Sequence, residues 1–120
     1  KSYNSTQRNL SQSFYLIFNE VEMYARVTNT IAQNEMQLTM WIETFKNIGS
    51  KKITDAGAIQ ITITKIAPNK AILMSVYPNK EVADKAINAI SENLKQVKEI
   101  VKVEISEGEV VFNQNSLSHE

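Results

Sequence analysis

Few side chains in this sequence are reactive, and their spacing limits the chemistry they could do. Glu20 and Glu22 would lie on one face of a strand, where paired carboxylates can shift each other's pKa for acid–base work, although solvated carboxylates are commoner. Tyr24 and Arg26 could line the mouth of a cavity on the same strand, but any half-exposed strand shows this alternation. His119 is the only histidine and has no partner ligand nearby, so we expect no metal site.

Two aromatic residues are ambiguous between packing and chemistry. Trp41 belongs to an apolar stripe at helical spacing, which is typical of a core anchor that packs on a sheet. Tyr77 precedes Pro78 at the end of an expected strand, a position that suits a sheet edge or a subunit seam better than a proton donor. No phosphate-binding loop or dinucleotide fingerprint is present. The sequence therefore contains no motif that is specific for one enzymatic reaction.

Composition narrows the class of protein. A chain of 120 residues, 42% hydrophobic and 22% charged, fits one globular domain. The absence of cysteine excludes disulfides, thiolate metal sites and a cysteine nucleophile. Thirteen basic residues balance thirteen acidic ones, and the densest basic cluster is Lys51-Lys52, so we expect no nucleic-acid partner.

The chain also lacks the usual membrane and export signals. No apolar run is long enough to span a bilayer, and the N-terminus has no basic-then-apolar pattern. We expect a soluble, cytoplasmic protein without a membrane partner, although a leader could have preceded Lys1. Residues 1–13 are polar and predicted to be flexible, residues 14–112 form a single domain, and residues 113–120 are a polar tail.

A β-hairpin is predicted over residues 59–77. Isoleucines alternate with polar residues over 59–66, the turn 67–70 contains Pro and Asn, and the strand 71–77 folds back antiparallel. Pairing Ala67 with Lys70 gives a register with one apolar face, Ile61, Ile63, Met74 and Val76. The opposite face is mixed and comprises Gln60, Thr62, Thr64, Leu73, Ser75 and Tyr77.

Two helices are predicted. The first runs from Thr30 to about Ile48, with Gly49 as its left-handed C-terminal cap. The second starts after Asn79, an N-cap, and presents an apolar stripe to the sheet as far as Val97. A strand from Val101 to Phe112 follows, with a bulge or a tight hairpin expected at Gly108.

The region before the first helix fits two interpretations. Residues 20–27 alternate in a period of two, which indicates a strand, while Phe14, Ile17, Phe18, Val21 and Ala25 also fit one helical stripe. We favour a strand that ends near Val27, because Thr28-Asn29 supply turn residues. The resulting order, β-α-β-β-α-β, is an α+β, ferredoxin-like arrangement with two helices on one face of an antiparallel sheet.

The second half of the chain resembles a known superfamily. The hairpin end Ser75-Val76-Tyr77-Pro78, the helix opening from Lys80 to Ala86 (KEVADKA) and the strand end from Glu107 to Val111 (EGEVV) resemble the dimeric α+β barrel proteins. Small proteins similar to antibiotic-biosynthesis monooxygenases are the nearest group, over roughly residues 56–112.

This resemblance implies a homodimer whose sheets pack through their uncovered faces, with a cavity between sheet and helices in each subunit. The mixed face of the hairpin is then the candidate dimer face, namely Gln60, Thr62, Thr64, Leu73, Ser75 and Tyr77. An ordinary solvent-facing sheet is the alternative, and we favour the dimer face because Leu73 and Tyr77 would otherwise be exposed.

The resemblance also implies oxidation of an aromatic or polycyclic molecule without metal or flavin, oriented by polar and aromatic side chains. Asn19 and Trp41 are of suitable types, whereas a haem-binding histidine is missing from the domain, so we expect no cofactor. The candidate cavity residues are Asn19, Tyr24, Trp41 and Tyr77.

A second function class stays open on the same residues. No convergent cluster of polar side chains is visible, which favours a non-catalytic interaction or ligand-sensing module. The catalytic residues, and whether the protein is an enzyme at all, are not decided by the sequence.

Overall fold

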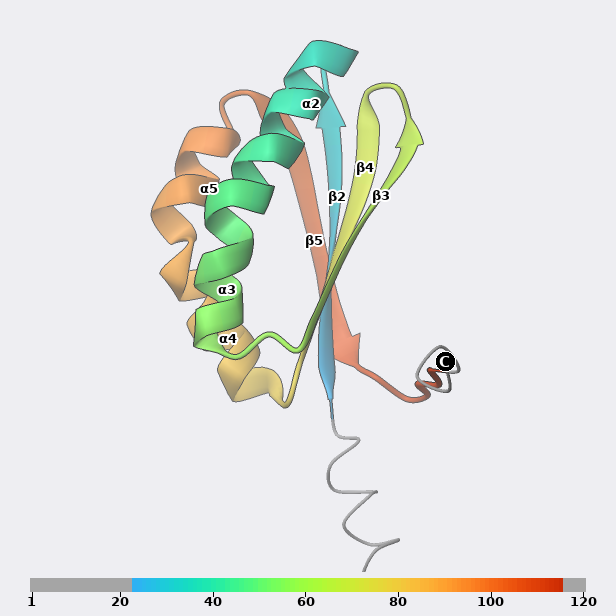
Figure 1. Cartoon of the computed structure of the whole chain (residues 1–120), viewed down its shortest axis with the longest axis vertical. Coiled ribbons are helices and arrows are strands. Elements are labelled where there is room, and N and C mark those ends of the chain that lie inside the picture. Colours follow the sequence, from blue (N-terminus) through green and yellow to red (C-terminus); the bar gives the residue numbers. More distant parts are fainter. Residues whose placement is uncertain (1–22, 116–120) are drawn as a thin grey trace, which may run out of the picture.

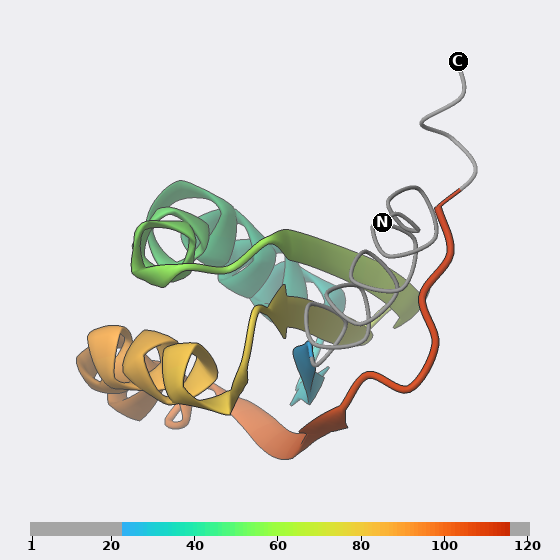
Figure 2. The same cartoon turned by 90° about the horizontal axis from the view of Figure 1, so that it is seen from below.

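The computed structural model describes residues 23–115, which form a four-stranded antiparallel sheet with helices on one face. Figures 1 and 2 show the two layers, and the strand order is β3-β4-β2-β5. The ferredoxin-like β-α-β-β-α-β prediction is therefore confirmed. In chain order the elements are β2 (Tyr24–Ala32), α2 (Glu35–Thr44), the π-helix η1 (Phe45–Gly49), α3 (Ser50–Ala56), β3 (Gln60–Ala67), β4 (Lys70–Tyr77), α4 (Lys80–Ala89), α5 (Ser91–Val97) and β5 (Val101–Glu109).

Strand β2 is longer than predicted, and the first helix starts later. The strand interpretation is right for the described residues, but β2 continues past Val27 to Ala32. Thr30, the predicted helix start, is fully buried in the sheet, where it pairs with Ala71 and Val103. The N-cap of α2 is Asn34, whose side-chain oxygen accepts a 2.9 Å hydrogen bond from the backbone nitrogen of Gln37. The alternative helical stripe over 14–21 lies outside the described residues.

The first helix also ends later than predicted. Gly49 has right-handed helical backbone angles, with φ −64°, so it is not a left-handed cap. The helix passes through η1 into α3, and it ends at Gly57, where φ is +127°. The reason is that Ile53 extends the apolar stripe by another turn and is buried against the sheet.

The predicted register of the β3–β4 hairpin is wrong by one residue. Ala67 pairs with Lys70 as expected, but a bulge follows, and Lys65 then pairs with Ala71. Because side chains alternate across a strand, one extra residue in β3 exchanges the faces of all residues before it. Ile61 is consequently opposite Ser75 and shares a face with it.

This shift divides the candidate dimer face between the two sides of the sheet. Leu73, Ser75 and Tyr77 lie on the helix-covered face and are buried, so they are not part of an uncovered face. Gln60, Thr62 and Thr64 lie on the opposite side. We call that side the open face; its strand neighbours at the centre are Ala25, Val27, Asn29, Ile72, Met74 and Val76.

The second helix begins as predicted, and the last strand differs. The Asn79 side chain accepts a 2.9 Å hydrogen bond from the backbone nitrogen of Val82 and caps α4, while a break at Ile90 separates α4 from α5. Strand β5 runs without interruption through Gly108, which pairs with Ala25, so the expected bulge or hairpin there is wrong. The segment after β5 continues on the open-face side of the sheet (Figure 2).

Candidate functional site between the helices and the sheet

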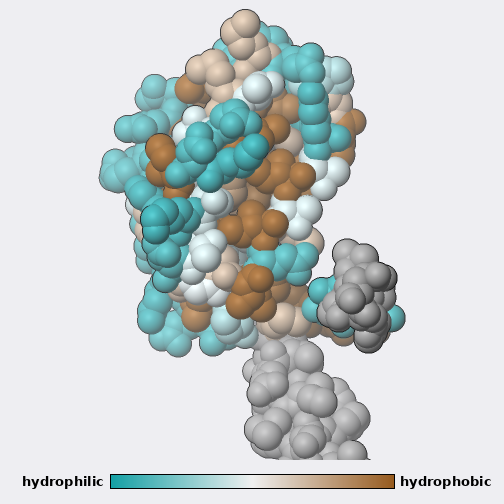
Figure 3. Space-filling view, viewed as in Figure 1, coloured by the Kyte–Doolittle hydropathy of each residue, from teal (hydrophilic) through white to brown (hydrophobic). Residues whose placement is uncertain are grey.

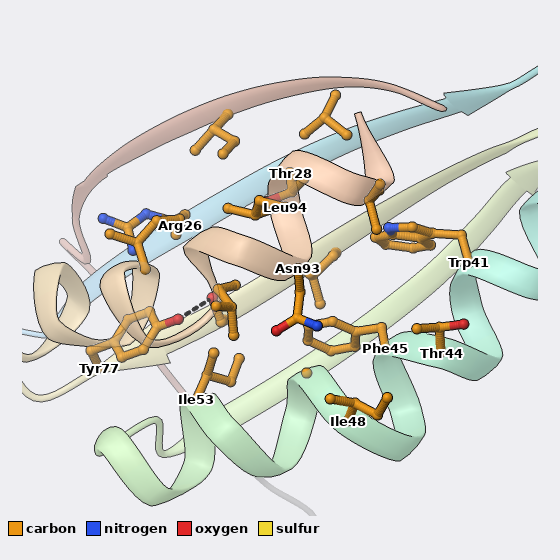
Figure 4. Close-up of a pocket in the computed structure, with 18 residues that line it drawn as sticks. Arg26, Thr28, Trp41, Thr44, Phe45, Ile48, Ile53, Tyr77, Asn93 and Leu94 are labelled. Atoms are coloured by element: carbon orange, nitrogen blue, oxygen red, sulfur yellow. Dashed lines mark hydrogen bonds between the residues drawn. The ribbon is translucent and has the colours of Figure 1, made fainter. Parts of the chain in front are cut away.

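An enclosed cavity of about 60 Å³ lies between the helices and the inner face of the sheet (Figure 4). Strands β2, β4 and β5 form its floor, and the two helical stretches form its roof. Its volume has room for a few water molecules and is below the roughly 150 Å³ of an engineered cavity that holds benzene. A one-ring ligand would therefore require the side chains of the wall to move apart.

One end of the cavity is aromatic and aliphatic. The rings of Trp41 and Phe45 stack with centroids 6.0 Å apart and an angle of 20° between their planes. The π-helix carries Phe45, Ile48 and Gly49 into the wall, in keeping with the frequent occurrence of π-helical turns at functional sites. Side chains of the second helical stretch and β5 complete the apolar part of the cavity wall, namely Ile87, Ile90, Leu94, Val97, Val103 and Ile105.

The other end is polar and is organised by Arg26, which is only 4% exposed. Its Nη1 donates a 2.7 Å hydrogen bond to the carbonyl oxygen of Ala83, and its Nη2 donates a 2.8 Å hydrogen bond to Oε1 of Glu107. The guanidinium carbon also lies 5.9 Å from the centre of the Tyr77 ring. Among the described residues, the Nε–H of Arg26 has no hydrogen-bond acceptor.

Two hydroxyl groups lie beside this guanidinium. The Tyr77 hydroxyl donates a 2.9 Å hydrogen bond to Oγ of Ser75, drawn as the dashed line in Figure 4. Both residues line the cavity and both are buried. Each hydroxyl carries one hydrogen, so the pair uses one of its two hydrogens internally and has the other to donate.

A chain of charges connects Arg26 to the surface. Asp84 Oδ1 lies 3.5 Å from Arg26 Nη2, and Asp84 Oδ2 lies 3.1 Å from Lys80 Nζ. The hydrogen bond to Asp84 raises the pKa of Lys80 above its usual value. Desolvation first, and then a hydrogen bond with the Glu107 carboxylate, raise the pKa of Tyr24.

A polar contact at the surface joins the two halves of the cavity roof. Lys52 Nζ, on α3, donates a 2.9 Å hydrogen bond to Oδ1 of Asn93, on α5. Asn93 also lines the cavity and lies opposite Phe45 in Figure 4. The contact is exposed to solvent, so it adds little to stability and can open without disrupting the core.

A second, open groove lies between α2 and β3, where Figure 3 shows apolar side chains exposed between the helices and the strands. Ile42, Ile61 and Ile63 form its apolar lining, with Lys46 and Lys65 beside them. It lacks the buried donors of the enclosed cavity, which is therefore the stronger candidate for a ligand site.

Comparisons with known proteins identify the fold and no family. No protein-family model matches the chain, and no curated protein matches it. Among solved structures, a dimeric ferredoxin-like protein from an uncultured marine organism superposes with a TM-score of 0.66 at 16% identity, over 81% of this chain and 95% of that one. The chain has the ferredoxin-like fold. At this identity the likeness extends to the fold alone.

Two other solved structures that match this chain are described as oxygenases. SnoaB from Streptomyces nogalater, a cofactor-independent oxygenase, matches with a TM-score of 0.60 at 8% identity, over 79% of this chain and 97% of that one. A proposed antibiotic biosynthesis monooxygenase from Chloroflexus aurantiacus matches with a TM-score of 0.56 at 13% identity, over 78% of this chain and 97% of that one. The predicted resemblance to these proteins is thus confirmed as a shared fold.

The structure brings together two of the four residues predicted to line a cavity. Trp41 and Tyr77 line the same cavity, at its aromatic and polar ends respectively. Tyr24 lies outside the wall and reaches the site through its hydrogen bond with Glu107. Asn19 lies outside the described residues. That these residues serve a ligand stays a prediction.

Sequence reasoning missed several residues of the wall. Arg26 was expected at a cavity mouth and is in fact buried, and Ser75 was assigned to the wrong face of the sheet. Alternation over residues 24–32 places Arg26 on the same face as Thr28 and Thr30, which could have indicated a buried polar strand face. No sequence pattern indicated that Phe45 and Asn93 would line the cavity. The position of Phe45 depends on the π-helix η1, and that of Asn93 depends on the break at Ile90.

Two further features concern residues 23–115. They contain no group of three His, Cys, Asp or Glu side chains placed to hold a metal ion. None of their helices has the length and apolar character needed to cross a membrane.

Proposed function

We propose that this chain binds a small apolar or aromatic molecule in the enclosed cavity and acts as a homodimer. The observation that carries the binding proposal is the Nε–H of Arg26, which has no acceptor among the described residues and belongs to a buried side chain at the polar end of a largely apolar cavity. Buried polar groups are almost always hydrogen-bonded, and a buried donor without a partner costs about 1–3 kcal/mol. A bound molecule with an acceptor at that end would remove this cost.

The composition of the wall favours binding over proton-transfer catalysis. Among the described residues, the wall contains no carboxylate, imidazole or amine, and its only ionisable groups are the Arg26 guanidinium and the Tyr77 phenol. An arginine stays protonated at neutral pH, so neither group is an ordinary general base. We therefore place a ligand-binding or ligand-sensing role first.

Cofactor-independent oxygenation is the second candidate function. The specific observation that favours it is the shared fold with SnoaB, combined with an aromatic wall that could hold a ring against Trp41. Such a reaction would need a substrate that loses a proton without help from a basic side chain in the wall. Oxygen uptake in the presence of a bound aromatic molecule separates this candidate from simple binding.

The open face of the sheet supports the homodimer. Val27, Met74 and Val76 form an apolar centre there, next to the polar side chains of β3; Val76 is buried, and Val27 and Met74 are half-buried. The segment after β5 lies on the same side in Figure 2, with Val111 92% exposed and Phe112 78% exposed. Exposed apolar surface of this kind marks protein interfaces, and solved structures with this fold are described as dimeric.

Titration followed by NMR tests the binding proposal. Trp41 is the only tryptophan, so its indole N–H gives one resolved reporter inside the cavity wall. We expect small aromatic molecules to shift this resonance in a saturable way, and those that carry a hydrogen-bond acceptor to shift that of the Arg26 Nε–H as well. Indole, benzene and phenol derivatives that leave both resonances unchanged up to millimolar concentration would contradict the proposal.

A further inference from the structure

The charges around Arg26 already cancel one another, which restricts the ligand group that can bind beside it. Arg26 lies 2.8 Å from the Glu107 carboxylate and 3.5 Å from that of Asp84. Lys80 lies 3.1 Å from Asp84. Two cations and two anions therefore form one network without net charge. The positive charge of the guanidinium is already balanced by carboxylates of the protein.

An anionic ligand group is disfavoured at this end of the cavity. It would lose its hydration on entering a buried site, a loss that only a countercharge in good geometry offsets. The countercharge of Arg26 is already engaged by Glu107, whose own carboxylate would repel a second anion. A carboxylate or phosphate ligand is therefore a poor fit.

A ligand without any acceptor is also a poor fit. It would fill the aromatic end, leave the Nε–H of Arg26 unsatisfied and offer no acceptor to the second hydroxyl hydrogen of the Ser75–Tyr77 pair. Both donors belong to side chains that line the cavity at the same end (Figure 4). One oxygen with two lone pairs could accept from both of them.

We propose that the ligand presents a neutral carbonyl oxygen, as in a ketone, aldehyde or amide, to Arg26 and Ser75. Its hydrocarbon part then lies against Trp41 and Phe45. This inference rests on the proposed binding function and deepens it by naming the chemical class of the ligand. The small cavity volume further favours a molecule of one ring over a polycyclic one.

Three probes of nearly equal size test the assignment, namely acetophenone, ethylbenzene and benzoate. They share a benzene ring and differ in carrying a neutral carbonyl, no acceptor, or an anion. Calorimetric titration of the full chain should give at least about tenfold tighter binding of acetophenone than of the other two, because a hydrogen bond from a charged donor is worth a factor of ten or more. Acetophenone alone should shift the Arg26 Nε–H resonance downfield.

Arg26→Lys provides the matched variant, because it keeps the positive charge and removes the Nε–H. It should weaken acetophenone binding about tenfold and change ethylbenzene binding less than twofold. Ser75→Ala should give a smaller loss for acetophenone alone. The Nε–H resonance of the unaltered protein tests the same contact if either variant fails to fold.

The outcomes separate this inference from the proposed function. Equal affinity for acetophenone and ethylbenzene, with the Trp41 indole shifted by both, would show a binding cavity and overturn the carbonyl assignment. Tightest binding of benzoate would overturn it as well. If none of the three probes shifts a cavity resonance, the proposed binding function is wrong and the carbonyl assignment falls with it.

Discussion

The ring of Phe45 lies against the backbone of Gly49, within the π-helical turn that forms one wall of the cavity. A Cβ atom on Gly49 would be 2.6 Å from Cδ1 of Phe45 and 3.0 Å from Cε1. Phe45 also stacks on Trp41, so its ring is held between a glycine and an indole. The missing side chain at position 49 therefore sets the position of an aromatic ring in the wall of the cavity.

Gly49→Ala should displace the Phe45 ring and destabilise the fold by about 1 kcal/mol. Overpacking typically costs 1–3 kcal/mol, of which alanine recovers about 1 kcal/mol through its higher helix propensity. Urea unfolding measures the change. Gly108→Ala is the control, since a Cβ there has no neighbour within 4 Å, and its stability should be unchanged or slightly higher. Equal stability of the two variants would show that Phe45 does not depend on Gly49.

Glu107→Gln should destabilise the protein more than Asp84→Asn. Glu107 accepts a 2.8 Å hydrogen bond from the buried Arg26, whereas Asp84 is 3.5 Å away and half exposed. Loss of the charged acceptor should cost about 1–2 kcal/mol, and loss of the outer carboxylate less than about 1 kcal/mol. Chemical denaturation of both variants gives the comparison, and a larger effect of Asp84→Asn would mean that Arg26 is held mainly from α4.

The order of the elements could be predicted from the sequence because each periodic pattern extends over a whole strand or helix, so no single residue decides it. Period-two alternation in residues 59–66 and 101–105, the turn at 67–70 and the Asn79 cap were sufficient for the hairpin, the second helix and the last strand. The errors came from single local events. One unpaired residue near Ile66 exchanged the faces of β3, and the buried Thr30 was mistaken for a capping residue.

The candidate site was harder to predict, because it too depends on local irregularities and tertiary contacts that leave no periodic pattern in the sequence. Tyr77 and Trp41 were recognised by type, but their shared cavity depends on the pairing of β4 with β2 and on the π-helix, neither of which has a sequence signature here. Burial of Arg26 depends on Ala83 and Glu107, which are 57 and 81 residues away in the chain. Such contacts follow from the tertiary fold and not from local spacing.

The free energy of unfolding should fall at alkaline pH, because Tyr24 and Lys80 have raised pKa values in the folded state. The pKa values of Tyr24 and Lys80 lie above their ordinary values of 10.0 and 10.5 respectively. Their contribution is therefore complete below about pH 10 and is lost as the pH rises through the folded values. Thermal unfolding at pH 9 and pH 11 measures the loss. Tyr24→Phe should show a smaller decline over this interval, and an identical decline would exclude Tyr24 as a contributor.

A charge at the centre of the open face should separate the proposed homodimer. Met74 lies there, between Val27 of β2 and Thr62 of β3, whereas Met36 is 73% exposed on α2, away from the sheet. An isolated charge buried between two sheets carries a desolvation penalty of several kcal/mol, enough to dissociate a dimer at micromolar concentration. Met74→Glu should therefore be monomeric, and Met36→Glu should keep the oligomeric state of the unaltered protein.

Size-exclusion chromatography with light scattering measures all three proteins, and circular dichroism shows whether the variants remain folded. A folded, dimeric Met74→Glu protein would move the interface to another surface, such as the groove between α2 and β3. A monomeric unaltered protein at micromolar concentration would contradict the homodimer itself. In that case the apolar centre of the open face and the exposed Phe112 would have to meet a different partner.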